Sequence, residues 1–428
     1  MTNSISVETA EQHARRMEWW REARFGLFIH WDISSLAGTE IGWSRGGSKP
    51  LDITGHPAGF VEDPHYDNLY KKFNPQKFDA KEWVRLAQAA GMKYIVFTAK
   101  HHGGFCMWDT KQTDYSIRHT PFQRDVVKEL AAACHAAGLR FGIYYSQRDW
   151  HHPDYGVGDN QKYLAYMNAQ LKELLTDYGK VDVIWWDSYG KGDLVNFWKI
   201  GETFVLVKAL QPDIVMNNRL AVLAHYNRQP TPYLGDFDTP EQQLGKYQDT
   251  RPWESCMTVV RVKDGGGWSY RSDGVVCPLT DCLRMLISCA TGDGNLLLDV
   301  GPDSTGVIPA DQAGRLVEIG KWLATNGESI YGTRGGPWKP GQGIGSTRKG
   351  NVAYVHILEA KGDTIVLPAL PHKIISASML GGGAIKNEVA DGKFILHLPE
   401  KRDPQAIVIK SKLAGSAMDI PAITWAME

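Results

Sequence analysis

Short apolar runs alternate with amphipathic segments from residue 18 to about residue 332. The segments 82–91 and 125–138 carry the apolar spacing of helices and end in glycine, which commonly closes a helix. Each leads into a short run of β-branched and aromatic residues, at 94–98 and 140–145. This succession of helix, glycine and buried strand predicts parallel β/α organisation.

The same unit recurs along the first three quarters of the chain. Strands are expected at 24–31, 94–98, 140–145, 181–186, 213–217 and 295–300, and further helices at 163–179 and 311–325. The chain has no Gly-x-Gly-x-x-Gly turn and no phosphate-binding loop, which disfavours a dinucleotide-binding fold. The pattern therefore predicts an α/β fold of the (β/α)8-type TIM barrel class, which takes about 250 residues.

The pattern changes near residues 334–338. Beyond them, short apolar runs at 352–357, 364–367, 374–379, 394–398 and 406–409 are separated by glycine, aspartate and proline. Regularly spaced short strands of this kind predict a small C-terminal antiparallel β-sandwich. We place the boundary at about 335 to 345, with a catalytic barrel over 1–335 and the sandwich over 345–428.

Polar residues follow the predicted barrel strands where each strand ends. They are His30, the pair His101 and His102, Tyr144 and Tyr145, Asp187, and the run from Asn217 to Arg219. Catalytic groups of TIM barrels sit at that end of the strands. Asp187 directly follows two tryptophans, and a carboxylate walled by indoles suits a cationic, sugar-like transition state. The competing interpretation of Asp187 alone is a cap for the next helix.

The amino-acid composition limits the classes of molecule that this chain is expected to bind. Of 428 residues, 43% are hydrophobic and 22% are charged, which describes a globular protein with a sizeable core. The net charge of −1 gives no long-range attraction to nucleic acid or to an anionic membrane, so neither is expected as a partner. The 15 tryptophans agree with a carbohydrate-handling protein.

The six cysteines form no Cys-x-x-Cys pair and favour a reducing compartment. No apolar stretch is long enough to span a membrane, and residues 1–16 lack the apolar region of a signal peptide. The expected location is the cytoplasm or, if a signal peptide has been removed, the periplasm or the outside of the cell.

The candidate chemistry is that of two carboxyl groups. Adjacent histidines on a strand point to opposite faces, so His101 and His102 are not expected to share a metal ion, and neither a metal nor another cofactor is expected. No Gly-x-Ser-x-Gly elbow indicates a serine nucleophile. Glycoside hydrolysis needs two carboxyl groups, for which Asp187 is one and the segment 235–242 or Glu254 offers the second.

Several motifs resemble a known family. They are 25–31, 100–106, 113–115, 185–187, 217–219, 294–298 and 301–303. In this order they are similar to the α-L-fucosidases of glycoside hydrolase family 29, over residues 19–332. The small C-terminal β domain also matches that family's layout.

The resemblance implies a retaining, exo-acting enzyme that hydrolyses terminal α-L-fucosides through a glycosyl-aspartate. Asp187 matches the nucleophile, and Glu241 matches the acid/base of several members, with Glu254 as the alternative. The residues that match sugar-holding or pocket-lining positions are His30, Trp43, His101, His102, Tyr145, Arg219, Trp268 and Tyr270. The expected ligand is a small carbohydrate or a glycan, and a homo-oligomer stays open.

The chain departs from the family pattern near the hydroxyl-binding residues. It has Asp32 where members commonly have glycine, Gly103 where they have aspartate, and Gly42 where they often have glutamate. Glu40 is assigned to the place of that glutamate. Swapped carboxylates change sugar discrimination. Two alternatives therefore stay open: a related α-glycosidase with altered specificity, for example for an α-L-galactoside or a substituted fucose, and a non-catalytic sugar-binding barrel.

Overall fold

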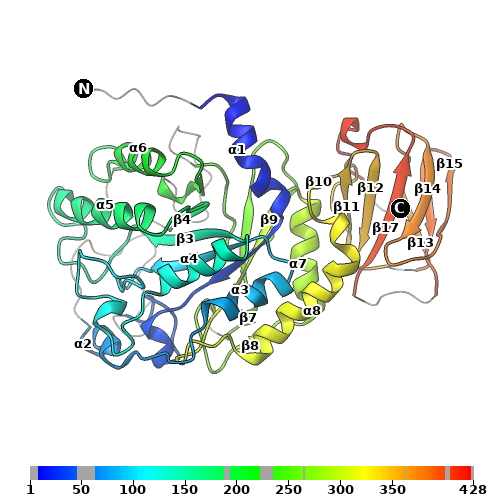
Figure 1. The fold of residues 1–428 in the computed structure, drawn as a ribbon. Coiled ribbons are helices and arrows are strands. Elements are labelled where there is room, and N and C mark those ends of the chain that lie inside the picture. Colours follow the sequence, from blue (N-terminus) through cyan, green and yellow to red (C-terminus); the bar gives the residue numbers. More distant parts are fainter. Residues whose placement is uncertain are drawn as a thin grey trace.

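The structure is a computed structural model that describes residues 8–45, 63–187, 193–221, 235–263, 266–360, 362–400 and 405–425 (Figure 1). A curled parallel α/β part forms most of it, and antiparallel sheets follow at the C-terminal end. The expected parallel organisation and the change to antiparallel strands are both confirmed.

The parallel sheet has seven strands in the order β5-β4-β3-β2-β1-β9-β6. Every neighbouring pair in this sheet is parallel, so all carboxyl ends lie at one edge of it. The strands are β1 (Phe25–Ile29), β2 (Tyr94–Lys100), β3 (Arg140–Ser146), β4 (Val183–Asp187), β5 (Val215–Met216), β6 (Glu254–Thr258) and β9 (Asn295–Val300).

Helices cover the outer face of this sheet (Figure 1). They are α3 (Ala80–Ala89), α4 (Val126–Ala136), α5 (Gln161–Thr176), α6 (Ile200–Leu210), α7 (Leu279–Thr291) and α8 (Ala310–Asn326). Helix α1 (Ala10–Ala23) instead packs Met17, Trp20 and Ala23 into the cluster on the inner face, and α2 (Pro64–Asp67) is a single turn. Asp79 caps α3 by accepting hydrogen bonds from the backbone N–H groups of Lys81 and Glu82, and Asp125 caps α4 in the same way. Short 3₁₀ turns occur at Ile33–Leu36, Leu69–Lys72, Ile117–His119, Asn218–Leu220, Gly327–Ser329 and Ala417–Asp419, and β7 (Val260–Arg261) pairs antiparallel with β8 (Val275–Val276).

Side chains along the parallel strands alternate between two hydrophobic clusters, one on each face of the sheet. On β4, Ile184 and Trp186 belong to the large cluster between sheet and helices, whereas Val183 and Trp185 belong to a second cluster on the inner, concave face. Successive side chains of a strand point to opposite faces. Asp187 therefore continues the inner series of Val183 and Trp185.

One further segment contacts both edge strands of the curled sheet. Isolated bridges join Phe237 to Asn217, just after β5, and Asp238 to Trp253, just before β6. A third bridge joins Glu241 to Cys256 within β6. The segment from 237 to 241 therefore runs between β5 and β6, which are the two ends of the strand order.

The C-terminal part contains two antiparallel sheets beside α7 and α8 (Figure 1). One has the order β10 (Arg334–Gly335), β11 (Ile344–Lys349), β12 (Val352–Ile357), β17 (Ile407–Leu413) and β14 (Ile374–Met379). The other has β13 (Thr364–Pro368), β16 (Lys393–His397) and β15 (Lys386–Ala390). Both contribute to one hydrophobic cluster, in which Trp338 stacks on Phe394. Among all the residues described, no helix has the length and apolar character that crossing a membrane requires.

Candidate active site

A cavity lies over the carboxyl ends of the parallel strands, where the inner residues of β1, β3 and β4 meet the residues that follow β2 and β5. It is lined by Phe28, His30, Trp43, His101, His102, Tyr144, Arg148, Trp185, Asp187, Arg219, Glu241, Cys256 and Trp268. The cavity thus combines aromatic walls, imidazoles, guanidinium groups and two carboxylates. Of the eleven residues that the sequence analysis assigns to the site, eight line the cavity, and Glu40, Tyr145 and Tyr270 do not.

Asp187 ends β4 and its carboxylate is held from three sides. Oδ1 accepts a hydrogen bond from Arg219 Nη1 at 2.8 Å, and Oδ2 accepts one from the Tyr144 hydroxyl at 2.7 Å. His102 Nε2 lies 3.4 Å from Oδ2. Burial alone would raise the pKa of Asp187, but Arg219, His102 and Tyr144 together hold it below its usual range. The carboxylate is therefore ionised.

Arg219 joins this carboxylate to the second one. Its Nη2 lies 2.8 Å from Glu241 Oε2, while its Nη1 binds Asp187. Its Nε donates to the Thr239 hydroxyl at 2.7 Å, and its guanidinium lies 4.4 Å from the centroid of the Trp185 ring. Because Nη1 and Nη2 are attached to the same carbon, one fixed guanidinium keeps the two carboxyl groups close together in the cavity.

Three histidines line the same cavity in their neutral form. Burial lowers the pKa of His101 to about 4 and lowers those of His30 and His102 well below their usual value. His30 Nδ1 lies 2.6 Å from Asp299 Oδ1, and His102 Nδ1 lies 2.6 Å from the Ser146 hydroxyl. Neutral imidazoles fixed in this way offer hydrogen-bond donors or acceptors to sugar hydroxyls without adding positive charge.

His101 and His102 lie together at the cavity, contrary to the expectation that they face opposite sides. The reason is that β2 ends at Lys100, so the two residues belong to the following turn, in which Gly104 N–H donates to the His101 carbonyl. Nitrogen atoms of both histidines and an oxygen of Asp187 lie within 4.8 Å of one another. Arg219 already neutralises Asp187, and its charge opposes a bound cation.

Aromatic rings wall the cavity. The Trp268 ring lies 5.0 Å from that of His30, the Trp43 ring lies 5.1 Å from that of His102, and the His101 ring stacks parallel to that of Tyr144 at 5.4 Å. Aromatic faces of this kind are large apolar surfaces that exclude water from a bound ring.

Tyr145 lies outside the cavity, which corrects the expectation for this residue. Its hydroxyl donates to Gln170 Oε1 at 2.7 Å, and its ring packs on the helix side of the sheet. Tyr144 occupies the inner face instead, paired in register with Trp185. That pairing with the strand of Asp187 is the signal that distinguishes the two tyrosines, because paired residues share a face.

Glu40 also lies outside the cavity, behind Trp268. Its carboxylate accepts hydrogen bonds from the backbone N–H groups of Gly267, at 2.8 Å, and Ser269, at 3.2 Å. These residues flank Trp268, so Glu40 fixes the backbone that carries this ring instead of contacting a ligand. Tyr270, expected beside Trp268, is likewise not among the lining residues.

Glu254, the alternative acid/base, begins β6 and faces the inside of the sheet at the end opposite the cavity. It accepts hydrogen bonds from the Tyr94 hydroxyl and from Trp185 Nε1, the latter at 3.1 Å. Tyr94 and Asn295, its neighbour on β9, are also first residues of their strands. Glu254 is therefore not among the residues that line the carboxyl-end cavity, whereas Glu241 is.

Comparison with known proteins identifies the family of this chain. The family model described as alpha-L-fucosidase matches residues 2–328. The chain belongs to the α-L-fucosidase family. The alpha-L-fucosidase of Dictyostelium discoideum is 29% identical over 95% of this chain and 88% of its own length. Tissue alpha-L-fucosidase of Homo sapiens is 29% identical over 79% of this chain and 75% of its own. The structure of alpha-L-fucosidase isoenzyme 1 from Paenibacillus thiaminolyticus superposes with a TM-score of 0.82 at 32% identity, covering 94% of this chain and 99% of that one.

The departures from the common motifs of the α-L-fucosidase family meet around Tyr66, one layer behind the cavity. Asp32 accepts from Ser34 N–H at 2.7 Å and lies 3.5 Å from the Tyr66 hydroxyl, which accepts from Gly42 N–H. A β-carbon at Gly103 would lie 3.2 Å from that hydroxyl. Burial raises the pKa of Asp32 to about 6. The exchanged carboxylates thus alter the support of the cavity and not its lining.

Proposed function

We propose that this chain is a retaining exo-α-L-fucosidase, with Asp187 as nucleophile and Glu241 as acid/base. The observation that carries the proposal is the sharing of Arg219 by the two carboxylates, at 2.8 Å each, inside one aromatic-walled cavity. Retaining glycosidases hold their two carboxyl groups about 5–5.5 Å apart, which leaves no room for a water between nucleophile and sugar. Two carboxylates on one guanidinium support this shorter spacing.

In the first step the ionised Asp187 attacks the anomeric carbon as the bond from that carbon to the aglycone oxygen breaks. Glu241 takes up a proton from solvent before this step, the leaving oxygen takes that proton, and a glycosyl ester of Asp187 forms. In the second step Glu241 removes a proton from water. The water oxygen bonds to the anomeric carbon, and the ester bond breaks with its electron pair returning to Asp187.

The other residues that line the cavity have separate roles in this mechanism. Arg219 and the Tyr144 hydroxyl keep Asp187 ionised before attack, and they stabilise the negative charge that returns to Asp187 when the ester bond breaks. The neutral His30, His101 and His102 supply hydrogen bonds for the hydroxyls of the sugar. Trp185 and Trp268 offer apolar surface to its ring and its methyl group.

The alternatives of an altered sugar specificity and of a non-catalytic binding barrel are less well supported. Asp32 and Gly103 are absent from the lining of the cavity, so they affect the sugar only through Tyr66. A binding barrel needs no ionised carboxylate beside a second carboxyl group. Asp187 and Glu241 offer both.

The contacts of the segment 237–241 also indicate its place in the architecture. We infer that the segment 237–241 takes the eighth position of the barrel, because it bridges both β5 and β6. Glu241 then belongs to the barrel wall like Asp187. We also retain the division into a catalytic barrel over 1–335 and a C-terminal β-sandwich over 345–428, which separate hydrophobic clusters support.

Three measurements test the function. Proton NMR of the first product from an aryl α-L-fucoside should show α-L-fucose before mutarotation, and an initial β-product would contradict retention. A 2-fluoro fucosyl fluoride should label Asp187 as an ester detectable by peptide mass spectrometry, and label on another residue would reassign the nucleophile. A panel of nitrophenyl α- and β-glycosides separates fucose from other sugars, and binding without turnover on all of them would favour the non-catalytic alternative.

A further inference from the structure

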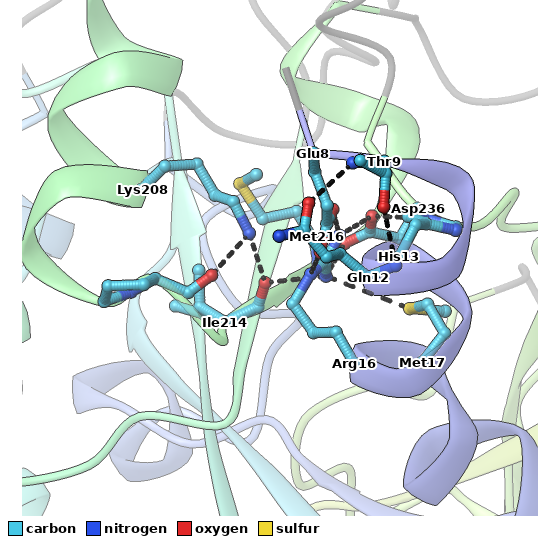
Figure 2. Close-up of polar contacts among 11 residues, drawn as sticks. Glu8, Thr9, Gln12, His13, Arg16, Met17, Lys208, Ile214, Met216 and Asp236 are labelled. Atoms are coloured by element: carbon cyan, nitrogen blue, oxygen red, sulfur yellow. Dashed lines mark hydrogen bonds and ion pairs between the residues drawn. The ribbon is translucent and has the colours of Figure 1, made fainter. Parts of the chain in front are cut away.

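The segment that carries Glu241 is fastened at its start by an aspartate. Both oxygens of Asp236 are occupied: Oδ2 accepts from Met216 N–H and from Arg16 Nη1, each at 2.8 Å, and Oδ1 lies 2.7 Å from Arg16 Nη2 and 3.1 Å from His13 Nε2. Asp236 N–H donates to the Met216 carbonyl at 2.6 Å. Asp236 is thus held by β5 on one side and by α1 on the other (Figure 2).

Arg16 is the centre of this contact and reaches it from α1, more than two hundred residues away in the sequence. Its Nε and Nη2 donate to the two oxygens of Glu8, at 2.9 and 2.8 Å, and its Nη1 also donates to the Ile214 carbonyl at 3.0 Å. Figure 2 shows the guanidinium among Glu8, Asp236 and Ile214. Two bidentate carboxylates and one carbonyl use the donors of the planar fork fully.

From Asp236 a short chain of contacts leads to Glu241. The Phe237 ring stacks on Trp20 of α1 at 4.4 Å, and the Phe237 carbonyl accepts from Asn218 N–H at 2.9 Å. Thr239 accepts from Arg219 through its hydroxyl and its carbonyl. The segment is therefore fixed by α1 at its first residues and by Arg219 at its last, with Glu241 as the end that faces the cavity.

We propose that Arg16 is a positioning residue for the acid/base Glu241, acting through Asp236 and the extended segment between them. The inference rests on the proposed role of Glu241 as the proton donor to the leaving oxygen. Helix α1, which contributes nothing to the cavity lining, then serves as an outer clamp on the catalytic segment.

The physical reason is the burial of Asp236. Without Arg16, the buried carboxylate keeps only its contacts with Met216 N–H and His13 Nε2 and loses the guanidinium, so it must take up a proton or move toward water. Gly235, at φ +77°, gives the chain a pivot directly before it. A displacement of about 1 Å at a catalytic group is enough for a loss of roughly 100-fold.

The surroundings of Arg16 provide a way to restore the contact. Arg16 and Glu8 line an open cavity of about 660 Å³, together with Lys208 and Trp19. A side chain truncated at position 16 leaves a hole that opens into this cavity. A small guanidinium ion can enter it and bind Asp236 and Glu8 in place of the lost side chain.

The test compares leaving groups, because only a poor leaving group needs a proton from Glu241. In Arg16→Ala, kcat/KM for phenyl α-L-fucoside should fall by about 100-fold, and for 2,4-dinitrophenyl α-L-fucoside by less than about threefold. Methylguanidinium, below denaturing concentrations, should recover at least about a tenth of the lost phenyl-fucoside activity. Arg16→Lys keeps the charge but not the fork, and should lie between wild type and Arg16→Ala.

The matched control is Arg21→Ala, which removes another ion pair of α1, to Asp293, away from the catalytic segment. It should change both substrates equally and should not respond to methylguanidinium. Equal losses on both substrates in Arg16→Ala, or no loss on either, would overturn the positioning role. Glu241→Gln serves as the reference: if it shows no dependence on leaving group, the acid/base assignment fails, and the positioning role fails with it.

Discussion

Asp187, which is exposed only to the cavity, and the fully buried Glu254 are two carboxyl groups at opposite ends of the same inner face, and their pKa values move in opposite directions. Burial raises the pKa of Glu254 to about 7, while the pKa of Asp187 stays below its usual range although burial raises it too. Both lie close to Trp185, which donates to Glu254 and carries Arg219 over its ring. The difference is the neighbour: Asp187 meets a guanidinium, and Glu254 meets the neutral Tyr94 and Trp185.

Asp187 and Glu254 differ in whether a neighbouring positive charge compensates the negative charge of the carboxylate. A cation beside a buried carboxylate offsets the cost of removing the charge from water, and it leaves an ionised oxygen ready to attack. Neutral donors satisfy the hydrogen bonds of the other carboxyl group but favour its protonated form. The two ends of the inner face therefore differ in charge compensation and not in the presence of a carboxylate.

Removing the guanidinium should have the largest effect, because it makes the two ends alike. In Arg219→Met we expect kcat/KM for an aryl α-L-fucoside to fall by about 10³-fold, the scale of leaving a buried charge without its partner. Arg219 depresses the pKa of Asp187, and attack needs the ionised form. The acid limb of the pH profile should therefore move to higher pH, as measured by kcat/KM between pH 3 and 8.

Arg219→Lys is the control for this change. Lysine keeps the positive charge but cannot hold Asp187 and Glu241 through one planar fork. It should lose activity while leaving the acid limb near its wild-type position. An unshifted acid limb in Arg219→Met would show that the cation does not set the ionisation of Asp187.

A smaller effect is expected from the tyrosine that donates to Asp187. Tyr144→Phe removes a hydrogen bond of 2.7 Å to an ionised oxygen and should lower kcat/KM by about 10-fold to 100-fold. Tyr145→Phe removes the bond to Gln170 on the opposite face. It should leave kcat/KM within about twofold and cost about 1 kcal/mol of unfolding free energy.

These neighbouring variants form a matched pair, because the substitution is the same and only the face differs. Initial rates on a nitrophenyl α-L-fucoside and thermal unfolding of both variants are the measurements. A loss of activity in Tyr145→Phe with none in Tyr144→Phe would reverse the assignment of the inner face of β3.

Tyr144 and Tyr145 also show which part of the site cannot be predicted from the sequence. Six of the seven parallel strands, the change to antiparallel strands, and the position of Asp187 at a strand end follow from local hydrophobic patterns, whereas β6 and α1 are not predicted by them. The choice between Tyr144 and Tyr145 depends on a register in which one residue reverses the face. Both residues are aromatic in a continuous apolar run, so the run itself contains no alternation to decide it.

Other parts of the site depend on contacts between distant segments. Glu40 binds the backbone around Trp268 from more than two hundred residues away, and Arg16 reaches Asp236 over a similar separation. No local pattern predicts such pairs. His101 and His102 face the cavity together because β2 stops at Lys100, and strand ends are the least predictable boundaries.

The smallest effect is expected at the other end of the comparison, where Glu254→Gln replaces a protonated carboxyl group by its neutral counterpart. The folded pKa of about 7 lies above the ordinary value of 4.5, so the folded protein binds the proton more tightly than the unfolded chain. Wild-type stability should therefore decline between pH 4.5 and pH 7, by up to about 3 kcal/mol, and stay level above pH 7. Glu254→Gln lacks this decline, so its advantage in melting temperature should be larger at pH 8 than at pH 5, with kcat within about twofold of wild type.

Glu82→Gln, at an exposed ion pair with Arg85, is the control and should give no such gain. An advantage equal at both pH values would mean that Glu254 titrates normally, and a large loss of kcat would return it to consideration as the acid/base.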